Sequence, residues 1–480
     1  VGAADYHRAR MALAAEGLHG GDRVAIQLRN GPEWVAFDQA ALSLGLVTVP
    51  LYTDDRPENI AFILRDAEVC LLLVQDAGRW RRLTPHLADA PALTRVLLLE
   101  AGDQAAALQA ADPRVRHVPE WLPASGGEFL VRDQADPQAL ASIVYTSGTT
   151  GRSKGVMLSH HNMLAVAHAA LTLIDCYEQD VFLSFLPLSH TLERTGGYYV
   201  PLMAGARVAY ARSIGQLAED LQQIRPTVLI AVPRVFERVY GRIKAQLSER
   251  PAVARWLFAR AVDVGWRRFL QQQGRGGWHP TLLLWPLLDR LVAGKVVARL
   301  GGRVRAAVSG GAALSPEIAR GFIGMGLPII QGYGLTETAP VVSVNPPGNN
   351  IPESVGLPVR GVRLRIAAND ELLVQGPGVM LGYWNNPAAT AGMIDAEGWL
   401  HTGDQARIGD TGHLYITGRI KDILVLSNGE KIPPADMELA MALDPLIEQA
   451  LVVGEGRPYL AALVVLNADA WAALAAAEGW

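Results

Sequence analysis

Short apolar runs alternate with helix-like stretches from the start of the chain to about residue 345. The runs are continuous and rich in branched side chains, which is typical of strands buried on both faces of a parallel sheet. They are VAIQL (24–28), VCLLLV (69–74), SIVYT (142–146), TVLIAV (227–232) and VRAAV (304–308). Ala- and Leu-rich helical stretches at 36–46 and 315–324 lie between them, and the second opens with an N-cap serine followed by proline. The alternation predicts layered α/β subdomains over residues 1–345.

The pattern changes beyond about Pro346. Short strand-like pieces, VRLRIA (362–367), ELLVQ (371–375) and HLYIT (413–417), alternate with glycine and proline. Residues 346–418 are therefore predicted to form a small antiparallel sheet or a β-barrel-like subdomain. Another α/β-like piece begins near Arg419 and runs to Trp480.

Composition and charge narrow the function classes. Half of the 480 residues are hydrophobic, which is enough to bury one or more large cores. Lys+Arg 43 against Asp+Glu 47 argues against a protein that coats nucleic acid. Two cysteines, Cys70 and Cys176, exclude a disulfide framework and a CxxC metal site. No apolar run reaches the ~18 residues that span a bilayer, and residues 281–292, the strongest candidate, predict a buried or surface-seated helix.

The segment YTSGTTGRSKGV (145–156) concentrates glycines, hydroxyl side chains and one lysine after a predicted strand. Glycines let backbone amides approach an anion closely, and hydroxyl groups donate to phosphate oxygens. Lys154 can neutralise charge as a mobile cation. We interpret the segment as a phosphate-binding loop, with an ordinary polar turn as the alternative. A P-loop NTPase is excluded by spacing, since its signature needs adjacent Gly-Lys followed by Ser or Thr, whereas Lys154 stands between Ser153 and Gly155.

This loop resembles the phosphate-binding loop of the acyl-adenylating superfamily, which includes acyl-CoA synthetases, firefly luciferase and peptide-synthetase adenylation domains. Four further segments resemble that family's motifs in the family's order: SGGAALS (309–315), QGYGLTET (331–338), GWLHTGD (398–404) and YITGRIKD (415–422). The resemblance covers nearly the whole chain. It implies a large N-terminal domain of α/β subdomains with the barrel-like subdomain, followed by a smaller, truncated α+β cap over 419–480. The ATP-binding residues that it implies are Thr146, Ser147, Gly148, Thr149, Thr150, Gly151, Lys154, Gly310, Gly311, Ala312, Gln331, Gly332, Tyr333, Gly334, Thr336, Asp404 and Arg419.

Four of these positions have a physical interpretation and a structural alternative. Glu337, in the same segment as Tyr333, is a hard oxygen ligand suited to Mg²⁺ beside a triphosphate, or a solvated loop carboxylate. Asp404 can accept two ribose hydroxyls, or it is a turn aspartate. Arg419 offers a rigid fork to ribose or phosphate oxygens, or it forms a structural ion pair. Tyr333 is an adenine platform or a packed core aromatic. With Lys154, we predict Glu337 and Arg419 as catalytic residues.

Two segments resemble the long-chain fatty-acid branch of the family. LPLSHTLER (186–194) resembles the form in which a histidine or aromatic residue sits where the carboxylate meets the nucleotide, so His190 is the candidate catalytic and acyl-binding residue. A satisfied hydrogen-bonding histidine is its alternative, and Glu193 and Arg194 are expected to pair with each other. VPRVFERVY (232–240) resembles the segment that bears the gate of the acyl tunnel, which makes Phe236 an acyl-binding candidate. Its alternative is core packing at helical spacing.

The C-terminal segment resembles the family's mobile cap. LVLSNGEKIPPADME (424–438) resembles the loop that swings in for thioester formation, where Gly429 would let the pantetheine arm pass. Lys421, two residues beyond Arg419, occupies the hinge position. Family members carry a late catalytic lysine, yet no lysine follows Lys431. We therefore expect a longer reading frame and weak or absent adenylation by residues 1–480 alone.

We thus predict ATP-dependent activation of a long-chain fatty acid to acyl-AMP and then acyl-CoA, with release of pyrophosphate and AMP. The expected cofactor is Mg²⁺, with ATP and coenzyme A as co-substrates, and no nucleic acid partner is expected. Two alternatives stay open: an acyl-AMP ligase that serves an acyl carrier protein, and a nonenzymatic binder of nucleotide or acyl-adenylate. We expect a cytoplasmic protein, with peripheral contact on the inner face of a membrane and a homodimer left open.

Overall fold

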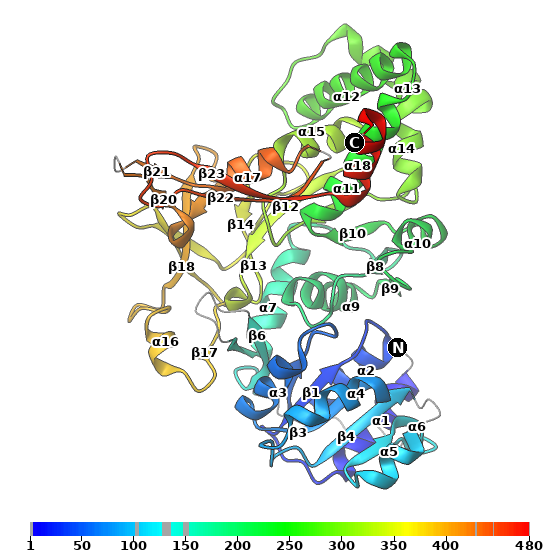
Figure 1. Ribbon diagram of the computed structural model, residues 1–480, viewed down its shortest axis with the longest axis vertical. Helices are drawn as coiled ribbons and strands as arrows, with labels where there is room; N and C mark the ends of the chain where they lie inside the picture. The colour runs from blue at the N-terminus through cyan, green and yellow to red at the C-terminus, as the bar shows by residue number, and fades with distance from the viewer. Residues whose placement is uncertain are drawn as a thin grey trace.

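The computed structural model describes residues 3–100, 105–126, 136–146, 153–427, 430–444 and 446–479. The chain forms an eight-stranded sheet, a seven-stranded sheet and a four-stranded sheet, followed by a small C-terminal unit (Figure 1). This is the mixed α/β architecture that the alternating pattern predicts.

The first sheet has the order β17-β7-β6-β2-β1-β3-β4-β5. Strands β6 to β5 in that order run parallel, whereas β7 and β17 are antiparallel additions at one edge. The strands are β1 (Arg23–Gln27), β2 (Val47–Pro50), β3 (Val69–Asp76), β4 (Arg95–Glu100), β5 (Val115–His117), β6 (Leu140–Thr146), β7 (Lys154–Ser159) and β17 (Gly382–Tyr383).

Helices cover both faces of this sheet, which explains its continuous apolar runs. Val24 and Ile26 of β1 pack with α1 and α2, while Ala25 between them packs with α3 and α4. The helices here are α1 (Ala3–Ala15), α2 (Pro32–Ser43), α3 (Pro57–Asp66), α4 (Ala77–Leu83), α5 (Ala105–Ala111), α6 (Val118–Trp121) and α7 (His160–Leu171).

The second sheet has the order β14-β13-β12-β11-β10-β8-β9, parallel from β12 to β9. Alternate residues again separate two faces. Leu229 and Ala231 of β10 pack under α11 and α15, and Val228 and Ile230 point to the other side. The strands are β8 (Val181–Ser184), β9 (Arg207–Tyr210), β10 (Val228–Ala231), β11 (Ala306–Ser309), β12 (Ile329–Gly334), β13 (Val341–Val344) and β14 (Leu357–Pro358).

A helical layer covers one face of the second sheet and extends to the upper end of the molecule in Figure 1. Its helices α12 and α15 cross closely, since a Cβ at Gly265 would lie 1.8 Å from the Gly324 carbonyl oxygen. The proline-containing segment at 281–292 is a helix broken into short turns, not a continuous one. The helices are α10 (Leu217–Ile224), α11 (Pro233–Ser248), α12 (Ala252–Gln272), η3 (Pro280–Leu284), α13 (Trp285–Leu288), η4 (Asp289–Ala293), α14 (Gly294–Arg299) and α15 (Pro316–Gly324).

The four-stranded sheet is antiparallel and has the order β15-β16-β18-β19. The strands are β15 (Arg363–Ile366), β16 (Glu371–Gln375), β18 (Leu400–Ile408) and β19 (Leu414–Arg419). The structure differs from a continuous β-rich unit over 346–418, because β17 within that range leaves to pair with β7 of the first sheet. Helix α16 (Pro387–Ala391) follows β17.

The C-terminal unit begins after β19. It contains η6 (Ile420–Asp422), β20 (Leu424–Val425), β21 (Lys431–Ile432), α17 (Ala435–Met441), β22 (Ile447–Val453), β23 (Ala461–Leu466) and α18 (Ala468–Glu478). Both strand pairs are antiparallel. Among the described residues of the whole chain, no helix is both long enough and apolar enough to cross a bilayer.

Candidate active site

A cavity of about 290 Å³ lies where the second sheet, α7 and the segment after His190 meet. Its wall combines residues from segments far apart in the sequence. The lining residues include Ala170, Ile174, Cys176, Phe182, His190, Thr191, Leu192, Thr195, Gly196, Val200, Val228, Ile230, Val308, Gly310, Gly311, Gly332, Tyr333, Gly334, Thr336, Glu337, Val341, Val344 and Arg419.

One part of the wall is apolar. Phe182, Val228, Ile230 and Val308 come from three parallel strands and share the face of the second sheet that is turned away from α11. Because side chains alternate along a strand, all four point to one side. This apolar wall can hold a hydrocarbon chain.

His190 stands at the N-terminus of a short helical turn, α8 (Thr191–Glu193). Its Nδ1 accepts a hydrogen bond from the Leu192 backbone N–H at 3.1 Å. Burial lowers the pKa of His190, so the neutral ring is favoured. Since Nδ1 is an acceptor, the proton of the neutral ring lies on Nε2, and His190 offers an Nε2–H donor to a cavity ligand.

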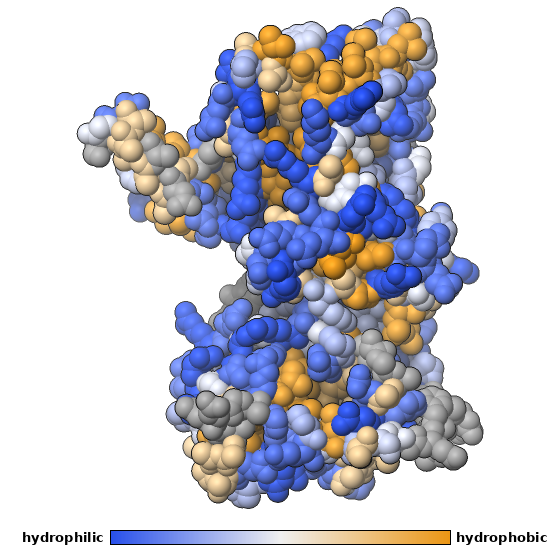
Figure 2. Space-filling view, turned by 90° about the vertical axis from the view of Figure 1, so that its right-hand side faces the viewer, coloured by the Kyte–Doolittle hydropathy of each residue, from blue (hydrophilic) through white to orange (hydrophobic). Residues whose placement is uncertain are grey.

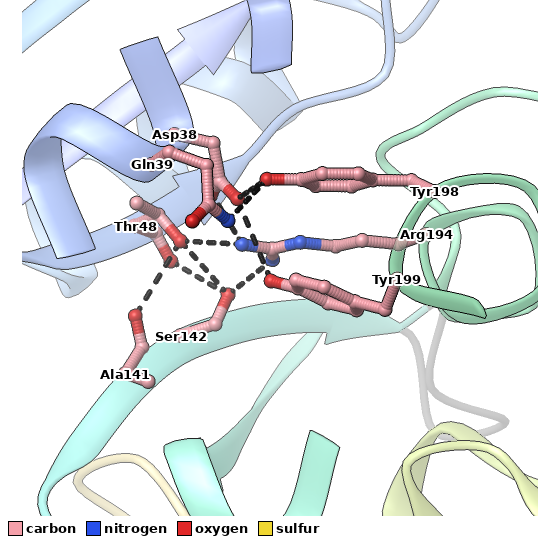
Figure 3. A network of polar contacts seen from close by, with 8 residues as sticks. All are labelled: Asp38, Gln39, Thr48, Ala141, Ser142, Arg194, Tyr198 and Tyr199. Atoms are coloured by element: carbon pink, nitrogen blue, oxygen red, sulfur yellow. Dashed lines mark hydrogen bonds and ion pairs between the residues drawn. The ribbon is translucent and has the colours of Figure 1, made fainter. Parts of the chain in front are cut away.

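The next turn, η2 (Arg194–Tyr199), is π-helical and carries Thr195 and Gly196 into the cavity wall. Arg194 points the opposite way and is buried, with 2% of its side chain exposed. It forms an ion pair with Asp38 of α2 and donates to Ser142 Oγ (2.7 Å) and Thr48 Oγ1 (2.8 Å) (Figure 3). The network therefore joins this wall of the cavity to the first sheet.

The polar part of the wall contains Glu337, in the turn η5 (Thr336–Thr338) after β12. The hydroxyl group of Tyr383 donates to Glu337 Oε1 at 2.8 Å, and Lys154 Nζ lies 5.1 Å from the centre of the same ring. Burial and the Glu337 charge raise the pKa of Tyr383, so its hydroxyl stays a donor. Tyr383 thus links the lysine and the carboxylate, although Lys154 is not itself part of the cavity wall.

Asp404, Tyr333 and Arg419 form a second polar cluster. Asp404 is buried; its Oδ2 accepts from the Tyr333 hydroxyl (2.6 Å) and its Oδ1 from Arg419 Nε (2.9 Å). Asp404 and Arg419 face each other across β18 and β19, so the strand register sets this pair. The Asp404 carboxylate raises the pKa of Arg419, and burial followed by Asp404 raises that of Tyr333. Each carboxylate oxygen keeps a further lone pair for a ligand hydroxyl.

Seven of the twelve predicted nucleotide-binding residues that the structure describes line the cavity, among them Tyr333 and Arg419. Gly310, Gly311, Gly332, Gly334 and Thr336 line it. At residue 334 only glycine fits, because a Cβ would lie 1.5 Å from the Pro340 carbonyl oxygen. Thr146 lies opposite Lys154 in the β6–β7 pair. Ser147, Gly148, Thr149, Thr150, Gly151 and the predicted CoA-side residue Gly429 lie outside the described residues.

Several predicted residues lie off the cavity wall, among them Gln331, Ala312, Phe236 and Lys421. The Gln331 amide accepts from the Leu314 N–H (3.0 Å) and donates to the Pro352 carbonyl, so it serves the loop structure. Ala312 does not line the cavity. Phe236 packs edge-on against Phe322, with ring centres 5.8 Å apart, on the opposite face of the second sheet. This placement favours core packing for Phe236. Lys421 is exposed in η6.

Sequence reasoning missed the apolar wall and Tyr383. Core strand residues and cavity strand residues have the same composition, so Val228 and Ile230 carry no signal of their own. Tyr383 is distant in sequence from both Lys154 and Glu337, and no motif marks it. A sequence signal existed only for two other residues of the cavity wall, Thr195 and Gly196, because they directly follow the LPLSHTLER segment.

The expected pair between Glu193 and Arg194 is wrong. Arg194 pairs with Asp38 instead, and Glu193 is 1% exposed with no hydrogen-bond partner for either carboxylate oxygen among the described residues. Adjacent residues on a helix point in different directions, which separates the two side chains. Burial raises the pKa of Glu193 to about 8, so the carboxyl group is protonated at neutral pH.

This burial predicts a pH-dependent stability. The Glu193 pKa rises from 4.5 in the unfolded chain to about 8 in the folded chain, so its stabilising contribution is complete below pH 4.5 and is lost as the pH rises through 8. We expect Glu193→Gln to raise the thermal midpoint relative to the unchanged protein by an amount that grows between pH 5 and pH 8. Exposed Glu178→Gln is the control. If the thermal midpoints of Glu193→Gln and the unchanged protein depend on pH in the same way, the pKa of Glu193 is not raised in the folded chain.

Comparisons with known proteins agree over nearly the whole chain. The sequence model of the AMP-binding enzyme family matches residues 3–384, and that of the AMP-binding enzyme C-terminal domain matches residues 421–478. The second match begins at Lys421.

Similar proteins include fatty-acid ligases. A long-chain-fatty-acid–CoA ligase of Mycobacterium bovis is 35% identical over 98% of this chain and 76% of its own length. The peroxisomal long chain acyl-CoA synthetase 6 of Arabidopsis thaliana is 31% identical over 97% of this chain and 68% of its own length.

Solved structures share the fold. The adenylation domain of a carboxylate reductase from Mycobacterium chelonae superposes with a TM-score of 0.77 at 25% identity, covering 99% of this chain and 73% of that one. An anthranilate CoA ligase in complex with anthranoyl-AMP superposes with a TM-score of 0.74 at 20% identity, covering 97% and 81%.

Proposed function

Because this chain belongs to the AMP-binding enzyme family, we propose that it is a long-chain fatty-acid–CoA ligase. It activates a fatty acid with ATP to acyl-AMP and then transfers the acyl group to coenzyme A, releasing pyrophosphate and AMP. Its similarity to long-chain-fatty-acid–CoA ligases, which spans nearly the whole of this chain and 76% and 68% of two such relatives, supports this assignment over the alternatives.

The observation that carries the proposal is one cavity with two kinds of wall. Val228, Ile230 and Phe182 provide an apolar surface for a hydrocarbon tail, and each buried CH₂ contributes about 0.8 kcal/mol. Glu337 and Arg419 belong to the same cavity and suit a nucleotide. His190 lies on the wall as well, where its Nε2–H can donate to the carboxylate that joins the two parts.

We assign the nucleotide to the polar wall. Lys154 and the loop that begins at Thr146 would hold the phosphates, with Ser147–Gly151 remaining predicted contacts. Asp404 would accept the ribose hydroxyls through its remaining lone pairs, and the Tyr333 ring would lie against adenine. Gly310, Gly311, Gly332 and Gly334 let the backbone approach the nucleotide, whereas Ala312 and Gln331 would act through loop structure.

Magnesium fits this site through Glu337. The described residues contain no group of three or more His, Cys, Asp or Glu side chains that could hold a metal by themselves. Mg²⁺ with a nucleotide commonly uses one or two protein carboxylates together with substrate phosphates, and Glu337 is a single such carboxylate. When bound, Mg²⁺ would neutralise charge on the phosphates. Tyr383 orients Glu337 for this role.

The proposed reaction has two steps, adenylation of the fatty acid and transfer of the acyl group to coenzyme A. A carboxylate oxygen of the fatty acid attacks the α-phosphorus of ATP, and the bond to pyrophosphate breaks, with Lys154 and Arg419 stabilising negative charge. The thiolate sulfur of coenzyme A then attacks the acyl carbon, and AMP leaves. We propose that the C-terminal unit turns about Lys421 between the steps, so that Gly429 comes beside the pantetheine arm.

The function is tested by following the two steps separately. Purified long-chain acyl-AMP with coenzyme A should give acyl-CoA and AMP, whereas ATP with fatty acid should give acyl-AMP only slowly, because no lysine follows Lys431. Replacing coenzyme A by acyl carrier protein separates the carrier-dependent ligase from the CoA ligase. Tight acyl-AMP binding without transfer to either acceptor would favour the nonenzymatic binder and overturn the proposal. A cytoplasmic location, peripheral membrane contact and a homodimer remain predictions.

The apolar wall predicts chain-length selectivity. Ala170 lies on α7 at the cavity, so Ala170→Phe should fill space that a long acyl chain uses. We expect the rate with a C16 acid to fall about tenfold while the rate with a C8 acid changes little, since pocket shape discriminates hydrocarbon length by roughly 10- to 200-fold. Leu164→Phe on the exposed side of α7 is the matched control. An equal loss of rate with both acids would show that the acyl chain does not lie beside Ala170.

A further inference from the structure

The cavity runs along the second sheet from one end of its strands to the other. Gly310 and Gly311 follow the carboxyl end of β11, and His190 follows that of β8. Val228, by contrast, is the first residue of β10, and Cys176 precedes β8. Because β8, β10 and β11 are parallel, the cavity extends from the carboxyl ends of these strands to their amino ends.

The cavity wall reaches the surface of the molecule at the amino ends of the strands. Phe182 of β8 is buried, whereas the wall residues that come from the end of α7 and the loop after it are half-buried or exposed. We call this end of the cavity the acyl port and define it by Ala170, Ile174, Asp175 and Cys176, of which Asp175 is exposed. The cavity therefore opens to solvent at the end opposite the nucleotide side.

The loop that forms the port is held in place from outside the cavity. Arg305, at the amino end of β11, donates to the Asp175 carbonyl oxygen at 2.7 Å and to Asp180 Oδ1 at 2.9 Å. Its guanidinium lies 4.8 Å from the centre of the Tyr177 ring, and the Tyr177 backbone N–H donates to Asp180 Oδ2 at 2.8 Å. These contacts fix the loop between α7 and β8 beside the opening.

Apolar side chains are exposed near the port. Leu202 and Met203 are exposed on α9 (Val200–Ala204), which packs against α7. The helix ends beside the loop, since a Cβ at Gly205 would lie 3.7 Å from Glu178 Cγ. Figure 2 views the side of the molecule on which Figure 1 places α9 and β9, and apolar atoms lie there at mid-height among hydrophilic ones. A chain that leaves the cavity thus meets a surface with apolar parts.

The path along the strands is shorter than a long acyl chain. The Gly310 N–H donates to the Ala231 carbonyl oxygen, so the path from Gly310 to Val228 follows the four residues of β10. Four residues of a strand span roughly 13 Å. An extended chain covers roughly 1.2 Å per bond, because three backbone bonds span about 3.3–3.6 Å. About eleven bonds therefore fill the path, and a C16 chain, with about fifteen bonds, extends beyond it.

We propose that the ω end of a long acyl chain leaves the cavity through the acyl port, so that the enzyme accepts fatty acids that carry a bulky or polar group at that end. This inference rests on the proposed function and names a substrate class for it. A chain of about six carbons ends inside the cavity, among the buried side chains of β8 and β10. A group on its ω end would overpack that space, whereas the same group on a C16 chain lies outside.

The first test measures whether a bound chain covers Cys176. The ligands are acyl-AMP analogues with an unreactive sulfamoyl linkage and a C6 or C16 chain, so binding is measured without turnover, and calorimetry gives each Kd. At a concentration of about ten times Kd, we expect the C16 analogue to slow labelling of Cys176 by N-ethylmaleimide about tenfold, because the unoccupied fraction falls by that factor. The C6 analogue should leave the labelling rate unchanged.

The second cysteine of the chain provides the control for this experiment. Cys70 lies on β3 of the first sheet, and mass spectrometry of peptides separates its labelling from that of Cys176 in the same sample. Its labelling rate should not depend on chain length. Burial raises the pKa of the Cys176 thiol to about 11, so labelling is slow and easily timed.

The second test places a pyrene ring on the ω end of both analogues. The C16 analogue should keep its affinity, whereas the C6 analogue should lose roughly tenfold or more, because its ring overpacks buried side chains. Tight binding of the C16 analogue without protection of Cys176, or an equal loss of affinity from pyrene on both chains, would overturn the acyl port. Failure of both plain analogues to bind would contradict the proposed function itself, and with it this inference.

Discussion

Glu337→Gln is expected to lower the single-turnover rate of acyl-AMP formation by roughly 100- to 1,000-fold, the range seen when one electrostatic contact to developing charge is removed. The amide keeps the size and the hydrogen bond from Tyr383, which lies 2.8 Å from Oε1, but loses the negative charge. Affinity for MgATP should fall roughly 10- to 100-fold, since contacts of charged groups contribute roughly 1.5–3 kcal/mol. Affinity for ATP without magnesium should change little.

Calorimetric titration with ATP in the presence and absence of Mg²⁺ separates these effects. Glu317→Gln, which changes an exposed carboxylate paired with Lys244, is the control. Tyr383→Phe keeps the ring beside Lys154 and removes only the donor to Glu337, so it should cost about 2- to 10-fold. If MgATP and metal-free ATP lose affinity equally in Glu337→Gln, Glu337 does not hold the metal.

Asp38→Asn is expected to lower the free energy of unfolding by about 3–5 kcal/mol, because it leaves the Arg194 charge buried without its counterion. The Arg194 side chain is 2% exposed and the Asp38 side chain 0%. Tyr198 and Tyr199 also donate to Asp38 Oδ2, at 3.1 and 3.5 Å (Figure 3). For a unit of this size the loss corresponds to a thermal midpoint lower by roughly 10 °C.

A double variant that removes both charges tests whether the pair itself is responsible. Asp38→Leu/Arg194→Met removes both charges, replaces the guanidinium that lies 5.4 Å from the centre of the Trp34 ring by an apolar side chain, and should recover most of the loss. Asp54→Asn removes an exposed carboxylate 3.9 Å from Arg79 and should change the midpoint little. Equal thermal midpoints for Asp38→Asn and Asp54→Asn would show that losing the buried counterion costs no more stability than losing an exposed carboxylate.

The sequence alone predicted the layered architecture and most of the residues that we assign to the nucleotide. Continuous branched runs identify β1, β3, β6, β10 and β11 because a strand buried on both faces needs apolar residues at every position. Proline and an N-cap serine mark the start of α15 for an equally local reason. Motif order then placed Glu337, Asp404 and Arg419, and the structure brings all three to one region of the fold.

Only the tertiary structure decided what those runs enclose. A doubly buried strand looks the same on both faces, so the apolar run at 227–232 could not show that Val228 and Ile230 line a cavity while Leu229 packs under α11. For the same reason Phe236 could not be separated from core packing. The Arg194–Asp38 pair joins residues 156 positions apart, and β17 returns to β7 from far along the chain. Such contacts depend on how whole elements pack, and local periodicity carries no information about the partner that a distant segment will provide.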